Sequence, residues 1–377
     1  MLKNLTELEQ RAVDAEINLA DGHPRQRLTE QQEAVAGRFT ELFDLARRAP
    51  FADVEHAAHT AFFEMLGQRS APVHSGRTFS VYSSSVATMV VSAVLAERGY
   101  SVGLLHPTFD NIHDLLVRVT AVTPVSEDRC AAADLSAVLA AGARCLFVTT
   151  PNNPTGWFLD AERFRALAAE CAVHGVILCV DASFRGFDTR AQFDHYAILE
   201  QTGASYLVIE DTGKLWPFAE LKLGFLAVSE DLRPAVEHAL SDVLLTVSPF
   251  VLKLVEALSV DGRQGGLDRL HTLVAANRER VGKAVAQLDG VQLADGDARV
   301  SVSRLAFSHS RQAGAVHDAL RVLGVHVLPC AQFHWAHPDE GRHLLRLALS
   351  RDPESLATGL SKLVEAHVTV QNAEKGW

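Results

Sequence analysis

A single lysine follows an apolar run that ends in acidic residues, and its surroundings favour amine chemistry. The run 208–211 has the composition of a strand end, and Lys214 comes directly after Gly213. The residues that follow, Leu215 and Trp216, are apolar. An ammonium group is costly to keep charged beside apolar side chains, so its free amine becomes available to attack a carbonyl carbon. We therefore hypothesise that Lys214 forms a Schiff base with the aldehyde of pyridoxal phosphate (PLP), with a solvated turn lysine as the alternative.

Polar side chains also follow other apolar runs of strand length. Ser83, Ser84 and Ser85 open a helix-length segment, where their donors and the helix dipole can bind a phosphate or simply cap the helix. Phe109, in the turn after the next run, can stack on a flat ring or pack in the core. Asn153 lies in a loop made rigid by prolines and a glycine, which can aim its amide at a phenolic oxygen.

Three charged residues complete this set. Asp181 ends a buried run, where a carboxylate needs a partner such as a protonated pyridine nitrogen or, alternatively, Arg185. Lys222 follows Lys214 closely enough to close a phosphate site. Arg346 interrupts an apolar run, and its planar fork suits a substrate carboxylate, with an internal Asp or Glu partner as the alternative.

The elements that would position these residues alternate between strand and helix length. Apolar strand-length runs lie at 77–82, 101–106, 143–149, 176–181, 205–209 and 224–229. Helix-length segments lie between them at 84–98, 109–118 and 160–174. This alternation predicts an α/β fold with a mainly parallel sheet covered on both faces. Ligands bind such sheets beyond the carboxyl ends of the strands, where the polar residues above fall.

The pattern along the chain also predicts its domains. A turn at 21–24 breaks the first segment, so residues 1–45 are expected to form an N-terminal arm that joins the small domain and covers the active site. Residues 46–245 are expected to form the large PLP-binding domain. Residues 246–377, with long helices and a strand–helix–strand tail, are expected to form a smaller α+β domain.

The composition argues against several classes of protein. A chain of 377 residues with 48% hydrophobic content can bury a large core. The net charge of −11, without a Lys/Arg block, argues against nucleic-acid binding. The longest apolar run, near 86–96, is too short to cross a bilayer, and no apolar signal core opens the chain. Five cysteines without Cys-x-x-Cys spacing favour reduced thiols, so we expect a cytoplasmic protein that binds no membrane.

In order and spacing, these residues resemble those of the fold-type I PLP-dependent enzymes of the aspartate aminotransferase family. The motif Asn153-Pro154-Thr155-Gly156 is followed by Asp181, Lys214, Lys222 and Arg346. The resemblance implies that fold and a homodimer, or a tetramer built from dimers, with shared active sites. It implies Lys214 as the Schiff-base lysine, Asp181 on the pyridine nitrogen and Asn153 on the ring phenolate. It also implies ring stacking by Phe109, phosphate binding by Ser84, Ser85 and Lys222, and substrate carboxylate binding by Arg346.

Three positions depart from the usual pattern of that family. Phe184 stands where an aromatic hydroxyl is usual, so the phenolate loses a donor that Ser183 can replace. Lys222 stands where an arginine commonly contacts the phosphate, and Asp211 stands where a small hydroxyl residue is usual. These changes alter charge and donors around the ring, so plain transamination does not follow from the fold.

The same departures match a narrower group, the PLP- and O2-dependent L-arginine hydroxylases and oxidases. The matching motifs are NLADGH at 18–23, YSSS at 82–85, HPTFDN at 106–111, EDTGKLWP at 210–217 and QFHW at 332–335. This resemblance implies oxidation of L-arginine to 4-hydroxy-2-oxoarginine, with 2-oxoarginine, ammonia and hydrogen peroxide, in specialised-metabolite (antibiotic) biosynthesis. It implies PLP and O2, with neither a metal nor a flavin.

Acidic residues of the arm and the strand end suit a guanidinium substrate. Glu9, Asp21 and Asp211 offer acceptors for a planar cation, and Thr6 can add another; a solvated surface carboxylate is the alternative for Glu9. His23 can move protons near neutral pH.

The expected reaction uses few groups of the protein. Arg346 grips the substrate carboxylate, and Lys214, displaced by arginine, removes the α-proton. O2 is then reduced, and His23 assists a proton transfer or the addition of water at Cγ. A conventional aminotransferase acting on a basic amino acid and a non-catalytic PLP-fold sensor are the alternatives. The choice between hydroxylase and simple oxidase stays open.

Overall fold

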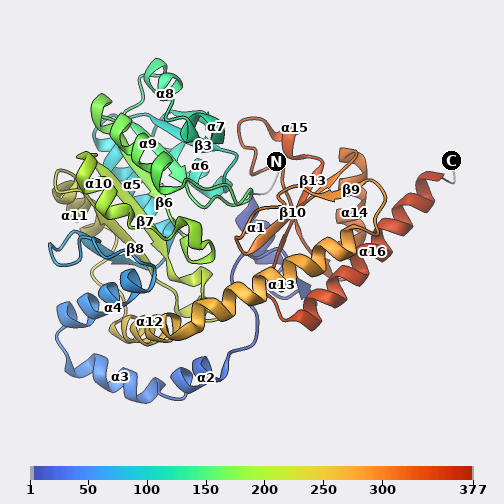
Figure 1. Ribbon diagram of the computed structural model, residues 1–377, viewed down its shortest axis with the longest axis horizontal. Helices are drawn as coiled ribbons and strands as arrows, with labels where there is room; N and C mark the ends of the chain where they lie inside the picture. Colours follow the sequence, from blue (N-terminus) through green and yellow to red (C-terminus); the bar gives the residue numbers. More distant parts are fainter. Residues whose placement is uncertain (1–3, 376–377) are drawn as a thin grey trace.

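A mixed sheet forms the centre of the larger part of the computed structural model, which describes residues 4–375 (Figure 1). Within these residues the sheet has seven strands in the order β2-β8-β7-β6-β5-β3-β4. Their bounds are Thr78–Val81 (β2), Val102–His106 (β3), Val122–Ser126 (β4), Cys145–Thr149 (β5), Ile177–Asp181 (β6), Tyr206–Asp211 (β7) and Gly224–Val228 (β8). Neighbours pair in parallel except at β8, which runs antiparallel to β2 and β7. The predicted α/β fold with a mainly parallel sheet is confirmed.

Two features of this sheet differ from the sequence-based expectation. β4 carries no apolar run because it is a partly buried edge strand that contains Pro124. β8 reverses direction because the connection from β7, residues 212–223, contains short 3-10 turns and no crossover helix. This connection carries Lys214 and Lys222.

Helices cover both faces of the large sheet (Figure 1). One face carries α5 (Ser84–Glu97), α6 (Asp110–Leu116) and α11 (Arg233–Ser241), and the other carries α4 (Phe51–Met65), α9 (Ala161–His174) and α10 (His195–Thr202). Successive strand residues point to opposite faces of the sheet. Leu104 therefore packs under α5, α6 and α11, whereas Leu105 packs on the face of α4, α9 and α10. The short helices α7 (Glu127–Ala131) and α8 (Ser136–Ala140) follow β4.

A smaller antiparallel sheet forms the second part of the molecule. Within residues 4–375 its order is β12-β13-β10-β9. The bounds are Val291–Leu293 (β9), Val302–Phe307 (β10), Leu328–Pro329 (β12) and Leu344–Ala348 (β13), with helices α13 (Leu267–Val285), α14 (Ser310–Val322), α15 (Pro338–Gly341) and α16 (Pro353–Lys375). Arg346, the predicted carboxylate-binding residue, lies on β13 opposite Arg304 of β10. All five residues of β13 are buried.

The N-terminal arm is bound to this smaller sheet region. After α1 (Leu5–Arg11), the two-residue strand β1 (Ile17–Asn18) pairs in parallel with β11 (Val325–His326). The guanidinium of Arg351 donates hydrogen bonds to three arm carbonyls, those of Asn18, Asp21 and His23.

Two further helices follow β1 and lead to α4. The next elements are α2 (Glu30–Ala36) and α3 (Phe39–Arg48), which lie with α4 against α12 (Pro249–Asp261). A π-helical turn, Gly262–Gly266, leads from α12 into the long helix α13.

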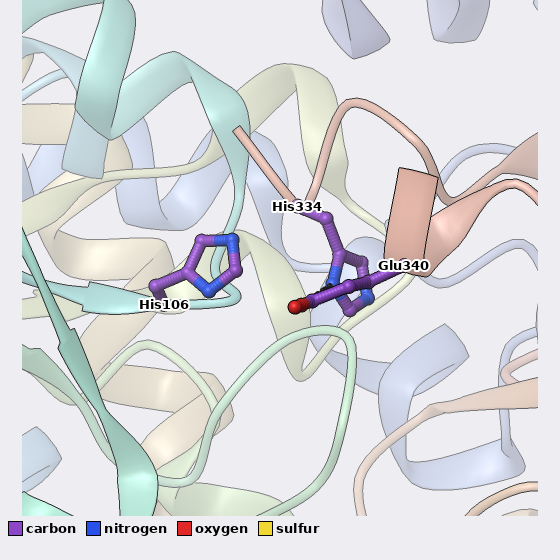
Figure 2. A group of neighbouring side chains, drawn as sticks. All are labelled: His106, His334 and Glu340. Carbon is purple, nitrogen blue, oxygen red and sulfur yellow. Dashed lines mark hydrogen bonds and ion pairs between the residues drawn. The ribbon is translucent and has the colours of Figure 1, made fainter. Parts of the chain in front are cut away.

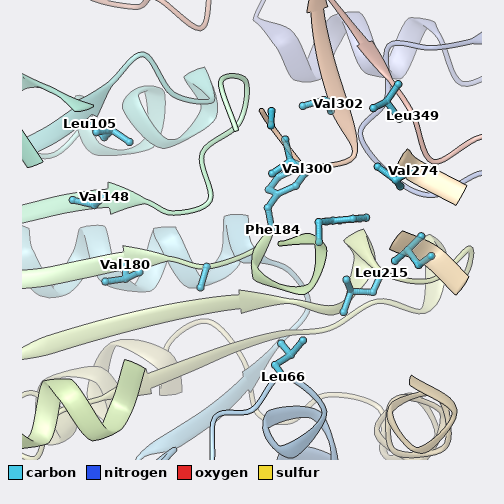
Figure 3. Packing of buried hydrophobic residues seen from close by; sticks show 14 of the residues in the cluster. Leu66, Leu105, Val148, Val180, Phe184, Leu215, Val274, Val300, Val302 and Leu349 are labelled. Carbon is cyan, nitrogen blue, oxygen red and sulfur yellow. The ribbon is translucent and has the colours of Figure 1, made fainter. Parts of the chain in front are cut away.

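One apolar core runs through both parts of the molecule. Figure 3 follows it from Val148 and Val180 on the large sheet through Phe184 to Val302 and Leu349 near the small sheet. Because this core is continuous, it marks no boundary at residue 45 or 245, and the predicted division at those residues stays a prediction.

The cysteines are all buried free thiols. Burial raises the pKa of Cys130, Cys171 and Cys330 to about 12, so these thiols are unreactive at neutral pH. Within residues 4–375, no helix combines the length and the apolar composition that a membrane crossing requires.

Candidate active site

A cavity of about 200 Å³ lies at the carboxyl ends of the central strands, under the arm. Nearly every residue predicted for the site lines it: Thr6, Glu9, His23, Ser84, Ser85, Phe109, Asn153, Asp181, Ser183, Asp211, Lys214, Lys222 and Arg346. Asp21 is the predicted residue that does not. The structure therefore brings together groups that are spread over most of the sequence.

The turn after β7 places the two lysines side by side. The Asp211 carboxylate accepts a hydrogen bond from the backbone N–H of Gly213 at 2.7 Å, which closes the turn Thr212–Lys214. A Cβ atom at Gly213 would come within 2.6 Å of the Lys222 side chain. Glycine is therefore required here so that Lys222 can pass close to the Lys214 turn.

His23 reaches both lysines from the arm. Its Nε2 lies 3.4 Å from Lys214 Nζ and 3.1 Å from Lys222 Nζ, while its Nδ1 lies 2.6 Å from an Asp21 oxygen. The positive charge of Lys214 and burial together lower the pKa of His23. We assign the neutral ring with the proton on Nδ1, because Asp21 accepts that proton and the lysines face Nε2.

Asp21 lies behind His23. Its carboxylate accepts from the His23 ring, from the His23 backbone N–H at 2.9 Å and from Arg25 Nε at 3.1 Å. Burial opposes ionisation, but the hydrogen bonds from His23 and the positive charge of Arg351 hold the pKa of Asp21 below its usual range. The geometry makes Asp21 a positioning residue for His23, and contact with a guanidinium stays a prediction.

Asp211 forms the acidic centre of the site. The Ser84 hydroxyl donates to it at 2.8 Å, while Ser83 caps α5 by accepting from Val86 N at 3.3 Å. Burial opposes ionisation of Asp211, but the positive charge of Lys214 and other nearby donors hold its pKa below the usual range. Phosphate binding by Ser84 is an untested prediction, since its hydroxyl serves Asp211 in this structure.

Asp181 is a buried carboxylate held by Ser183. The Ser183 N–H and hydroxyl donate to the same Asp181 oxygen at 3.0 and 2.5 Å. The alternative partner Arg185 instead pairs with Glu210 at 3.1 Å, and within residues 4–375 Asp181 makes no ion pair. Burial raises the pKa of Asp181. A buried carboxylate without a cation fits a pyridinium N–H donor. The predicted contact of Ser183 with a phenolate is untested.

Arg346 crosses from the small sheet to the cavity and is fully buried. Its guanidinium donates to Asn153 at 3.1 Å, to Glu9 at 3.2 Å and to the Ala20 carbonyl. It also lies over the Phe333 ring, 5.3 Å from the centroid. The internal acidic partner considered as an alternative is thus present as Glu9, which comes from the arm.

Further residues of the cavity were not predicted from the sequence. Thr88 and Asn111 also line it. Thr88 lies one helical turn after Ser84 on α5, so helical spacing would have indicated it. Asn111 lies two residues after Phe109, which directly precedes α6 and packs on Phe333 with ring centroids 5.8 Å apart.

The arrangement matches a known family. A family model for aminotransferase class I and II matches residues 16–363. The chain belongs to this family. Membership implies PLP as the cofactor, and the residues fit it: Lys214 as the Schiff-base amine, Asp181 as the unpaired buried carboxylate and Lys222 as a cation for the phosphate.

Individual relatives differ in how much of this chain they match. The chain is 45% identical to MppP, in a structure soaked with the product 2-ketoarginine, with TM-score 0.90, covering 93% of this chain and 99% of that one. It shares its fold with the aspartate aminotransferase of Thermus thermophilus, at 17% identity, TM-score 0.75 and 97% coverage of both. Histidinol-phosphate aminotransferase 2 of Caulobacter vibrioides is 27% identical over 64% of this chain and 61% of its own length. The chain spans about half to three-fifths of such curated relatives.

Proposed function

We propose that this protein oxidises L-arginine with PLP and O2 to 4-hydroxy-2-oxoarginine, with 2-oxoarginine as a side product. The observation that carries the proposal is the arm, which holds His23 within 3.4 Å of Lys214 and Glu9 beside Arg346. The 45% identity to MppP, soaked with 2-ketoarginine, supports arginine as the substrate.

Substrate binding would begin with an exchange of partners at Arg346. Glu9 accepts a hydrogen bond from the guanidinium of Arg346 at 3.2 Å. The arginine carboxylate takes that place, because it offers two oxygens to the planar fork. Glu9 is then free to accept from the guanidinium of the substrate, with Thr6 on the same helix. The arm would thus bind the guanidinium of the substrate, while Arg346 and Asn153 bind its carboxylate end.

Proton transfer falls to Lys214 and His23. When bound, PLP supplies the electron sink that makes the α-proton of arginine acidic. The free amine of Lys214 takes this proton. Neutral His23, whose Nε2 lies 3.4 Å from Lys214 Nζ, then accepts it from Lys214. Asp21 stabilises the imidazolium that results, since it already accepts from Nδ1.

The electrons leave to O2 in pairs. Each two-electron oxidation reduces one O2 to one H2O2, and hydrolysis releases ammonia. The 4-hydroxy product requires two such oxidations, and water adds at Cγ, so its hydroxyl oxygen comes from water. The simple 2-oxo acid requires one.

An oxygen electrode tests this function directly. Purified enzyme with L-arginine, without any 2-oxo acid, should consume two O2 per hydroxylated product and one per 2-oxoarginine. In water labelled with 18O, the Cγ hydroxyl should carry the label. Absence of O2 uptake with L-arginine, or label entering from 18O2, would overturn the proposal.

The second candidate is a conventional aminotransferase acting on a basic amino acid, favoured by the similarity to histidinol-phosphate aminotransferases. That enzyme would turn over arginine without O2 and only with an added 2-oxo acid. A non-catalytic sensor would bind arginine without turnover in either condition.

We also propose a cytoplasmic homodimer with shared active sites. Family membership supports the dimer, and buried free cysteines suit a reducing compartment. Light scattering during gel filtration distinguishes about twice the 40.9 kDa chain mass from a tetramer. A monomer would contradict the shared site.

A further inference from the structure

Two histidines and a glutamate meet on the far side of the loop that carries Phe109. Figure 2 shows His106 at the end of β3 facing His334 and Glu340 from the loop and short helix before β13. One side-chain nitrogen or oxygen from each lies within 4.8 Å of the others. The cluster therefore joins the large sheet to the small one, outside the PLP cavity.

The two histidines are prepared as ligands. Nε2 of His106 and Nε2 of His334 are buried and have no hydrogen-bond partner. A buried polar atom without a partner is costly, and native proteins rarely leave one without a reason. An imidazole ring binds a metal ion in its neutral form, through the lone pair of one ring nitrogen.

Glu340 adds a negative charge to the cluster and connects it to the solvent. Its carboxylate lies 3.4 Å from His334 Nδ1, and its side chain is 58% exposed. Since it is exposed, it can move toward the histidines without repacking the core. Ions can enter from this side.

We propose that His106, His334 and Glu340 bind one Zn²⁺ ion that fastens the large sheet to the small domain. Two imidazoles and one carboxylate form a ligand set that Zn²⁺ uses, with water in a fourth position. Tetrahedral ligands about 2.1 Å from Zn²⁺ lie about 3.4 Å apart. The ligand atoms now lie up to 4.8 Å apart, so metal binding draws the two histidine rings inward as well as the Glu340 carboxylate, which moves from the Nδ1 side of His334.

The site would act on the active-site walls. His106 precedes the segment in which Thr108 N donates to the Phe333 carbonyl at 3.1 Å. Phe333 contacts both Phe109 and Arg346, which line the PLP cavity. A cation between His106 and His334 therefore holds this contact closed, without taking part in electron transfer. No ligand spacing in the sequence indicated a metal, because the ligands come from distant segments.

Metal binding by the full-length, PLP-loaded enzyme tests the proposal. After chelator treatment, titration with Zn²⁺ and elemental analysis should give one ion per chain. Glu340→Gln should weaken binding at least about tenfold, and His334→Ala should abolish it. Co²⁺ in place of Zn²⁺ should give a visible d–d spectrum that both variants lose. His174→Ala removes a histidine of an exposed His–Glu pair elsewhere, so it should leave binding unchanged.

Hydrogen exchange provides the second readout. Zn²⁺ should slow exchange in residues 106–109 and 333–346 of the wild type but not of Glu340→Gln, whose exposed site keeps the variant folded. Absence of stoichiometric binding, or equal binding by the wild type and both variants, would overturn the site. Binding without a change in exchange would overturn its fastening role.

Discussion

The carboxyl ends of the central strands and the N-terminal arm meet at Lys214, but they are held in place in different ways. β6 and β7, which end at Asp181 and Asp211, are paired on both sides and fully buried. The arm brings His23 in through a two-residue strand and through hydrogen bonds from Arg351. A central strand cannot shift without breaking two ladders, whereas the arm is held by one two-residue ladder and by hydrogen bonds from side chains such as Arg351.

This difference separates two kinds of role in the proposed function. The carboxyl ends of β6 and β7 carry groups that would hold the cofactor. The arm carries His23 and Glu9, which would select the substrate and the product. Substitutions at these strand ends should therefore abolish activity, whereas substitutions in the arm should alter which product forms.

Lys214→Ala should have the largest effect. Loss of the Schiff-base amine should lower O2 uptake with L-arginine by about 10³-fold or more and remove the visible band of the bound cofactor. Oxygen-electrode and absorption measurements check both. Lys283→Ala, at an exposed position on α13, is the control and should be fully active. More than a few per cent residual activity in Lys214→Ala would contradict the role of this residue.

Arg351→Ala tests how the arm is held. Arg351 is buried and donates to the carbonyls of Asp21 and His23 at 2.5 and 2.8 Å, so its loss leaves these acceptors unpaired. We expect the free energy of unfolding to fall by about 3 kcal/mol and cleavage of the arm by protease to accelerate, while PLP stays bound.

The control for that prediction is Arg27→Ala. Arg27 also joins the arm to the last helix, through Asp352 and Glu354, but its side chain is 78% exposed. Its loss should change stability by less than about 0.5 kcal/mol. Equal effects of the two substitutions, measured by urea denaturation, would mean that Arg351 does not anchor the arm.

His23→Ala tests the effect of the arm on the product. The ratio of 4-hydroxy-2-oxoarginine to 2-oxoarginine should fall at least about tenfold, since a proton acceptor is lost next to Lys214. Chromatography of the products measures the ratio, with His238→Ala, at an exposed position on α11, as the control. An unchanged ratio would remove His23 from this role.

Asp110→Asn should have the smallest effect on activity, and its effect on stability should depend on pH. Leu5 N of the arm donates to Asp110 at 2.8 Å, and burial raises the pKa of Asp110 from 3.8 to about 7. The folded protein thus keeps a proton that the unfolded chain releases near pH 4. The contribution of Asp110 to stability therefore falls as pH rises from about 4 to about 7, and is constant above that.

Asparagine keeps an acceptor for Leu5 N but does not titrate. We expect the unfolding free energy of the variant to exceed that of the wild type at pH 8, and this difference to shrink as the pH falls toward 4. Urea denaturation at the two pH values measures this. A difference that is the same at both would contradict the raised pKa of Asp110.

Much of the cavity could be predicted because the sheet is mainly parallel. The carboxyl ends of parallel strands lie at the same end of the sheet. Residues at or just after these ends, such as Asn153, Asp181 and Lys214, therefore lie close together for any conformation of the loops. The buried apolar runs of β5, β6 and β7 made those strand ends visible in the sequence.

Partners between distant segments could not be predicted in the same way. Carboxylates at Glu9, Asp21 and Asp211 look alike in sequence, yet one pairs with Arg346, one orients His23 and one accepts from Ser84. Which acceptor meets which donor depends on how the arm packs on the two sheets.

The sequence by itself determined the α/β fold and predicted the strand-end residues that line the cavity, Lys214 among them, because period and order set these locally. Only the tertiary structure decided that Asp21 lies behind His23 and that His106 meets His334 and Glu340. Those contacts join segments far apart in the chain, and side-chain packing between the two sheets and the arm, rather than local pattern, sets their distances.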